Sequence, residues 1–187
     1  IGASVKVLES LVLPLDNVNP REGESGEFVA VWQGRAWWAA NSTSEKKGRL
    51  YFSPIGRPEA VEGFINLSEN DDPTQIPIVW NERLYCFTTS SLYTILTTDP
   101  PFVPHKIAGV PGTTFPHTVT STPFGIPYQA SDGIRIFDGA RSQLAAFEAL
   151  FPILQGESAE NLSSFVGTFA AYGNDEYIIS DESQTLA

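Results

Sequence analysis

The sequence has no methionine, a single cysteine and few positive charges. One thiol, Cys86, cannot form a disulfide within the chain or supply a zinc site that needs several cysteines. No apolar run approaches the roughly 18 residues that a membrane-spanning helix needs, and residues 1–8 lack the basic start of a signal peptide. The absence of methionine, with Ile1 in first place, indicates a processed or partial chain of a longer protein.

The charge balance is acidic, with 11 Lys and Arg against 22 Asp and Glu, which gives a net charge of −11. Proteins that wrap nucleic acid or lie on anionic membranes need clustered cations, so both functions are disfavoured. Charged residues make up only 18% of the chain, below the average of about 25%.

Turn-forming and aromatic residues are abundant and scattered along the chain. There are 15 Gly, 14 Pro, 12 Phe, 6 Tyr and 4 Trp, while runs of helix-forming residues are nearly absent. Short strands separated by turns give this composition, so an all-β fold is expected.

Four candidate hairpins recur, each with a turn beside aromatic residues. They are WQGRAW at 32–37, WNERLY at 80–85, PFGIPY at 123–128 and YGNDEY at 172–177. Their closing aromatics, Trp37, Tyr85, Tyr128 and Tyr177, are separated by 48, 43 and 49 residues. Further candidate strands precede or follow these hairpins, at 28–31, 49–53, 76–79, 91–95, 133–137, 165–169 and 184–186.

A unit of about 45 residues with three or four short antiparallel strands has the size of one propeller blade. We therefore predict a β-propeller, or a propeller segment, of about four such blades; a sandwich or another β fold is the alternative. An N-terminal strand and loop occupies 1–27, and the repeats are placed at about 28–70, 76–115, 119–160 and 165–187, the last incomplete. Leu144, Phe147 and Leu150 have helical spacing, so one short helix is expected near 140–151.

No residue pattern singles out a catalytic, cofactor or metal site, and a non-enzymatic protein is expected. His105 and His117 lie outside any nucleophile or zinc motif. Carboxylates capable of glycoside hydrolysis would come from Asp71, Asp72, Glu82, Asp132 and Asp138, but the repeated sialidase turn is missing. Trp37 and Trp38 point to opposite faces of one strand, so one of them faces outward or an interface. An outward tryptophan is suited to stacking on sugar rings.

Three stretches resemble the β-propeller virion proteins of tailed phages. WNERLYCFTTSSLYTI at 80–95 matches a strand of the form (N/G)-x-R-L-x-x-F-T followed by S-(L/I)-Y-x-(L/I). SDGIRIFDG at 131–139 matches D-G-(I/V)-x-x-(F/L)-D-G, and GRLYFSPIGRPE at 48–59 is similar to the upstream strand and turn. The resemblance covers about 28–180, and Pro123 and Pro127 depart from it in the third hairpin.

By these motifs the chain resembles the tail nozzle and packaged-DNA stabilisation proteins of short-tailed phages. The resemblance implies a structural protein of the virion, assembled in the host cytoplasm, that stabilises the DNA channel before ejection. It implies a homo-oligomeric ring beside tail, adaptor or portal proteins, with DNA passing through acidic walls without tight binding and no membrane partner. A glycan-binding or glycan-cleaving propeller and a cellular scaffold propeller are the alternatives. The aromatics expected to pack the blades are Trp32, Trp37, Tyr51, Trp80, Tyr85, Tyr93, Phe137, Tyr172 and Tyr177.

Overall fold

The computed structural model describes residues 28–39, 47–58, 60–68, 72–144, 167–174 and 176–181. The chain divides into two compact units, residues 1–106 and 107–187, and each is described by itself. In the described residues, every regular element is a β-strand except one turn of 3-10 helix. The predicted segments 1–27, 145–151 and 184–186, together with Asp71, lie outside the described residues.

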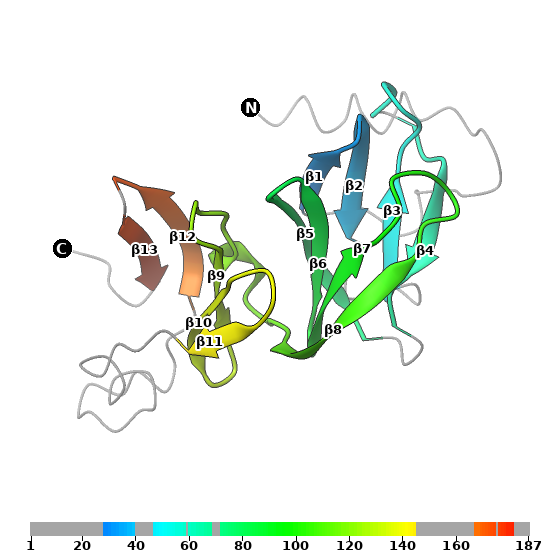
Figure 1. The fold of residues 1–187 in the computed structure, drawn as a ribbon. Helices are drawn as coiled ribbons and strands as arrows, with labels where there is room; N and C mark the ends of the chain where they lie inside the picture. Colours follow the sequence, from blue (N-terminus) through cyan, green and yellow to red (C-terminus); the bar gives the residue numbers. More distant parts are fainter. Residues whose placement is uncertain are drawn as a thin grey trace, which may run out of the picture. The chain divides into compact units, whose positions relative to one another are not determined.

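The first sheet is a four-stranded antiparallel meander in which neighbours in sequence are neighbours in space (Figure 1). Its first turn has two central residues with positive φ, Gln33 at 51° and Gly34 at 71°. This is the pattern of a type I′ turn, whose twist matches that of a two-residue hairpin. The strands are β1 (Val29–Trp32), β2 (Arg35–Ala39), β3 (Arg49–Phe52) and β4 (Gly63–Asn66).

The second sheet repeats this arrangement. Its first turn again has two residues with positive φ, Asn81 at 48° and Glu82 at 62°. The strands are β5 (Thr74–Trp80), β6 (Arg83–Thr88), β7 (Ser91–Ile95) and β8 (Pro104–Pro111), in the order β5-β6-β7-β8. Strand β8 crosses the division between the two units.

The first hairpins of these two sheets match residue for residue at an offset of 48. Trp32 pairs with Arg35 across the first turn, and Trp80 pairs with Arg83 across the second. Because side chains alternate along a strand, matched residues lie on matched faces. We call the face that carries Trp37 or Tyr85 the front face, and the face that carries Trp38 or Cys86 the back face.

The second unit contains a sheet of three strands, in the order β11-β10-β9. Residues 118–122 run beside β9 in place of a fourth strand, with Thr120 N donating to Pro127 O at 3.2 Å and an isolated bridge between Thr122 and Gly125. Pro127 has no N–H to donate in return, so a regular ladder cannot form here. The elements are η1 (Pro116–Thr118), β9 (Ile126–Ala130), β10 (Gly133–Phe137) and β11 (Ser142–Leu144).

The last described hairpin joins β12 (Gly167–Gly173) to β13 (Glu176–Asp181). Gly173 pairs with Glu176 across the turn, where Asn174 has φ of 52°. Tyr172 and Tyr177 are therefore direct cross-strand partners.

The all-β class and the antiparallel sheets are confirmed, whereas no closed propeller is found in the described residues and the number of blades stays a prediction. The helix predicted near 140–151 is wrong at its beginning, because Ser142–Leu144 is strand β11. The Asp138 carboxylate accepts hydrogen bonds from the amides of Ala140 and Arg141, at 3.0 and 2.9 Å. This turn returns the chain along β10, and pairing with β10 outweighs the helical spacing of the apolar residues.

Candidate interaction surface

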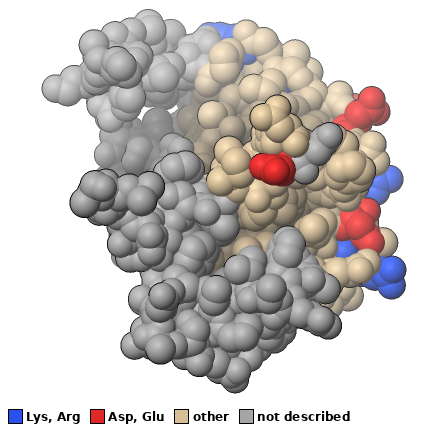
Figure 2. Space-filling view, turned by 90° about the vertical axis from the view of Figure 1, so that its left-hand side faces the viewer, with Lys and Arg blue, Asp and Glu red and all other residues tan. Residues whose placement is uncertain are grey.

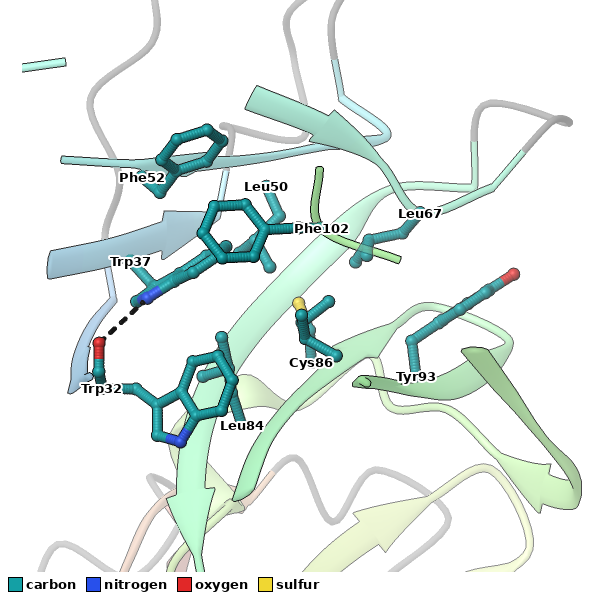
Figure 3. Packing of buried hydrophobic residues seen from close by; sticks show 10 residues of the cluster. Trp32, Trp37, Leu50, Phe52, Leu67, Leu84, Cys86, Tyr93 and Phe102 are labelled. Atoms are coloured by element: carbon teal, nitrogen blue, oxygen red, sulfur yellow. Dashed lines mark hydrogen bonds between the residues drawn. The ribbon is translucent and has the colours of Figure 1, made fainter. Parts of the chain in front are cut away.

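The front face of the first sheet packs on the back face of the second sheet through one buried cluster (Figure 3). Trp37 is fully buried there, and its ring lies 4.8 Å from that of Phe102 and 5.2 Å from that of Phe52, centre to centre. Tilted and edge-to-face contacts of this kind add to the free energy gained from burial. The cluster comprises Trp32, Trp37, Leu50, Phe52, Leu67, Leu84, Cys86, Tyr93, Ile95 and Phe102.

Both tryptophan N–H groups of this cluster have acceptors. Trp37 Nε1 donates to the carbonyl of Trp32 at 3.3 Å. Trp32 Nε1 donates to the carbonyl of Glu82 at 2.8 Å. The second bond connects the first hairpin to the turn of the second hairpin, so it fixes the register in which the two sheets stack.

A buried arginine lies at the edge of the same cluster. Arg35 is only 6% exposed, and its guanidinium donates to the Ser53 carbonyl at 2.8 Å and to the Glu62 carboxylate. The rings of Phe52 and Phe102 lie 5.8 and 5.6 Å from its central carbon. Paired charge, hydrogen bonds and aromatic faces together offset the cost of removing this cation from water.

The back face of the first sheet carries a row that crosses all four strands in register. Val29 pairs with Trp38, Trp38 with Tyr51, and Tyr51 with Phe64. The Trp38 and Tyr51 rings are nearly parallel, with 14° between their planes and 5.9 Å between centres. Arg49 lies 3.9 Å from the Phe64 ring centre. We call Val29, Trp38, Tyr51 and Phe64 the aromatic row. Tyr51 is buried in it, at 1% exposed, whereas Val29 is exposed and Trp38 and Phe64 are partly exposed, and these three side chains form the candidate interaction surface.

The nine aromatics singled out from the sequence do not form one cluster. Trp32, Trp37 and Tyr93 belong to the buried cluster, and Tyr51 lies on the opposite face of the first sheet. Tyr85 is buried on the front face of the second sheet beside the partly exposed Trp80, with ring centres 6.4 Å apart. In the second unit, Phe137 is fully buried, while Tyr172 and Tyr177 are partly exposed.

The fourth hairpin differs in register from the first two. Trp37 and Tyr85 lie two residues after the residue that closes their turn, whereas Tyr177 lies only one residue after Glu176. Tyr177 therefore faces the other way, and its hydroxyl donates to the Thr118 carbonyl at 2.8 Å. Burial raises the pKa of Tyr177 above its usual range. The residue at the position of Trp37 is Ile178, which is 59% exposed.

The described carboxylates that were catalytic candidates serve local structure or lie on turns. Asp72 accepts from the hydroxyls of Thr88 and Ser90, at 2.6 and 2.5 Å. Asp132 accepts two hydrogen bonds from Arg135, which lower its pKa. Amide hydrogen bonds at the β10–β11 turn lower the pKa of Asp138. Glu82 is exposed at the turn between β5 and β6.

The remaining reactive side chains are not gathered into a site. His105 is exposed on β8, and His117 is exposed in η1. Cys86 is fully buried, and burial raises the pKa of its thiol. Among the described residues, no group of three or more His, Cys, Asp or Glu is placed to hold a metal ion. The same part of the chain contains no helix that is long and apolar enough to span a membrane.

Sequence reasoning missed Arg35, Glu62 and Phe102. A signal for the arginine is present, because W-x-x-R-x-aromatic occurs at 32–37 and again at 80–85. The second copy, Arg83, is exposed, so the motif alone does not tell which arginine is buried.

The chain was also compared with known proteins. No protein-family model matches it, and no curated protein matches it. What the chain does is therefore inferred from its own residues and its stacked sheets.

Proposed function

We propose that this chain is a structural, non-enzymatic protein of a tailed-phage particle. It forms part of a homo-oligomeric ring in the tail or neck, where it stabilises the DNA channel and the packaged genome. Neighbouring tail, adaptor or portal proteins are its partners. DNA passes along the ring during ejection without being held tightly.

The observation that carries this proposal is the front-to-back stacking of two matched four-stranded meanders. Neighbouring blades of a β-propeller pack in this manner, and the offset of 48 residues fits the length of one blade. The phage-like stretch 80–95 forms the turn after β5 and the strands β6 and β7. The phage-like stretch 131–139 forms β10 and its two turns. The resemblance thus falls on the strands and turns that build the sheets.

The net charge of −11 is consistent with a channel role. Phosphates are repelled by carboxylates and attracted by clustered cations. An acidic ring therefore lets DNA slide, whereas a basic ring would retain it.

Electron microscopy tests the proposal in two steps. Negative-stain images of the purified full-length protein are expected to show closed rings with an axial hole. Antibodies raised against the chain are expected to label the tail or neck of particles whose genome encodes it. Particles that carry no label, although the antibody recognises the denatured protein in the same lysate, would refute the virion role.

A glycan-binding propeller is the second candidate, and the partly exposed Trp38 of the aromatic row favours it. Trp38 is partly exposed and lies parallel to Tyr51, with Phe64 and Arg49 beside them. Flat aromatic faces stack on sugar rings, and a guanidinium donates to hydroxyls or carboxylates. A glycan array separates the candidates, because saturable binding that Trp38→Ala abolishes supports the glycan function and its absence favours the structural one.

A further inference from the structure

The back face of the first sheet carries polar side chains next to the aromatic row. Arg49 lies two residues before Tyr51 on β3, and it pairs with Asn66 on β4. Because side chains alternate along a strand and paired residues share a face, both lie on the face that carries the aromatic row. Asn66 is exposed, and the other members of the surface defined next are partly exposed. We call Trp38, Arg49, Phe64 and Asn66 the polar–aromatic patch.

The guanidinium of Arg49 lies against an aromatic ring and not beside a carboxylate. Its central carbon is 3.9 Å from the Phe64 ring centre, and within the described part of the chain no carboxylate is paired with it. Three other arginines form ion pairs with Asp or Glu, namely Arg35, Arg135 and Arg141. Figure 2 shows Lys and Arg at only a few places on the described surface of one face, several of them beside Asp or Glu. A guanidinium has five N–H donors and no acceptor, so Arg49 is able to bind an anion.

The burial of Tyr51 limits where a ligand can approach the patch. Tyr51 is only 1% exposed, so the centre of the aromatic row is covered. The side chains around it, Trp38 on β2 and Phe64 on β4, are partly exposed. Strand β4 is the edge of the sheet in the order β1-β2-β3-β4. A ligand therefore reaches Asn66 and Arg49 from the β4 edge and extends toward Trp38.

We propose that the polar–aromatic patch binds an acidic sugar, that is, a sugar whose ring carries a carboxylate. The carboxylate accepts two parallel hydrogen bonds from the planar guanidinium of Arg49, whose geometry matches its two oxygens. The carboxamide of Asn66 both donates to and accepts from the ring hydroxyls. The C–H face of the sugar packs on the flat ring of Trp38.

The charge of the chain explains why one arginine is able to select the ligand. A net charge of −11 repels acidic ligands at long range, so their binding depends on a short, charge-assisted contact. Arg49 supplies that contact for a carboxylate, whereas a neutral sugar gains only ordinary hydrogen bonds from it. The inference rests on the glycan-binding candidate of the proposed function and is independent of the virion role.

A glycan array tests the class of ligand. It contains uronate, sialylated, sulfated and neutral glycans, and saturable binding is expected to be confined to the carboxylated members. Oligogalacturonate and its methyl ester are a matched pair, because the ester keeps the rings and the ring hydroxyls but not the negative charge. Isothermal titration calorimetry is expected to show that the ester of a carboxylated ligand binds at least about tenfold more weakly.

Substitutions then separate the charge from the stacking. Arg49→Gln is expected to weaken binding of the acidic glycan about 10- to 100-fold and to leave the residual binding of the ester unchanged. Arg49→Lys keeps the charge without the planar geometry and is expected to restore part of the affinity. Trp38→Ala is expected to abolish binding of both probes, because stacking does not depend on the carboxylate.

Arg141→Gln is the matched control, because it removes the same charge from a side chain that is 76% exposed. This variant is expected to bind the acidic glycan as the parent protein does. Circular dichroism verifies that each variant is folded before its affinity is compared.

Three results would overturn the inference. They are equal affinity for carboxylated and neutral glycans, a preference for sulfated glycans, and an Arg49→Gln protein that binds the acidic glycan as tightly as the parent. Each of the three leaves the glycan-binding candidate standing. An array on which no glycan is bound would refute both that candidate and this inference, whereas the virion role is decided separately by the labelling of particles.

Discussion

At the scale of single residues, the partners of a side chain decide its environment more than its place in the repeat does. Arg35 and Arg83 occupy the same position after matched turns. Arg35 is buried because Glu62 and the Ser53 carbonyl receive its guanidinium, whereas Arg83 is exposed. The sequence pattern predicts the position of both arginines but not this difference, since Glu62 lies outside either hairpin.

Replacing Trp37 by alanine should reveal how strongly the two sheets depend on each other. Trp37 is fully buried and contacts Trp32, Phe52 and Phe102. Truncating such a residue leaves a cavity and should lower the free energy of unfolding by about 3–5 kcal/mol. Urea unfolding followed by circular dichroism measures the loss. Phe124→Ala, at a 74% exposed position, should change stability by less than about 0.5 kcal/mol, and equal effects would contradict the packing.

The Arg35–Glu62 pair should matter more than an exposed pair of the same chemistry. Glu62→Gln leaves a buried guanidinium without a charged partner and should cost about 1–3 kcal/mol. Asp132→Asn breaks a pair whose carboxylate is 51% exposed and should cost less than about 1 kcal/mol. The same unfolding assay compares the two variants. A smaller loss for Glu62→Gln than for Asp132→Asn would show that Arg35 is held mainly by its aromatic neighbours.

At the scale of elements, hairpins with tight two-residue turns are the features that the sequence predicts best. The hairpins at 32–37 and 80–85 and the strands at 91–95 and 133–137 follow from aromatic alternation and turn residues, and they are confirmed. Strands β4 and β8 were not predicted, because Gly63 and Asn66 in β4 and Pro104 and Gly109 in β8 have low strand propensity. β8 lies at the edge of its sheet, where proline is tolerated.

The substitution Gly125→Ala, which adds one methyl group, should disrupt the three-stranded sheet β11-β10-β9. This residue has φ of 151°, and a Cβ atom there would lie 2.4 Å from the Phe137 carbonyl oxygen. Gly125→Ala therefore forces β9 and β10 apart, and we expect a large loss of folded protein. Gly56→Ala is the control, because Gly56 has φ of 69° but nothing within 4 Å of its Cβ position. It should cost only the backbone strain of about 1–2 kcal/mol. Solubility and circular dichroism compare the two, and a well-folded Gly125→Ala protein would contradict the turn geometry.

At the scale of the whole molecule, the sequence predicted the repeat length but not which face of each sheet is buried. The offset of 48 residues relates the first two hairpins fully. The later offsets, 43 and 49, relate aromatics that lie at different register positions, because Pro123 changes the third turn and Tyr177 lies one residue nearer its turn. Val31 is 70% exposed, whereas Val79, at the matching position of the second sheet, packs against the buried cluster. This difference depends on which sheet covers the residue, and the sequence of one hairpin does not predict it.

Low pH should reduce the stability of the second unit, and Asp132 and Asp138 should account for much of this reduction. Hydrogen bonds from Arg135 and from backbone amides lower the pKa of Asp132 and Asp138 in the folded state. Their contribution to stability is present above the ordinary aspartate pKa of about 3.9 and is lost as pH falls through the lower folded values. The urea midpoint of the second unit should therefore fall below about pH 4, and Asp132→Asn with Asp138→Asn should reduce this fall.

Two spectroscopic signals distinguish the unfolding of the two units in that experiment. All four tryptophans, at 32, 37, 38 and 80, lie in residues 1–106. Tryptophan fluorescence thus follows the first unit, whereas circular dichroism follows both. A double variant with the same acid response as the parent protein would show that other groups control the second unit.

The meander order of the sheets also has a consequence for how the chain folds as it is made. Every described strand pair joins strands that are neighbours in sequence, from β1 with β2 to β12 with β13. Local pairings of this kind close short loops and form quickly, and domains fold from the N-terminus during synthesis. The first sheet can therefore be complete before β5 leaves the ribosome. The second sheet then packs on the front face of the first sheet, where Trp37 is already in place.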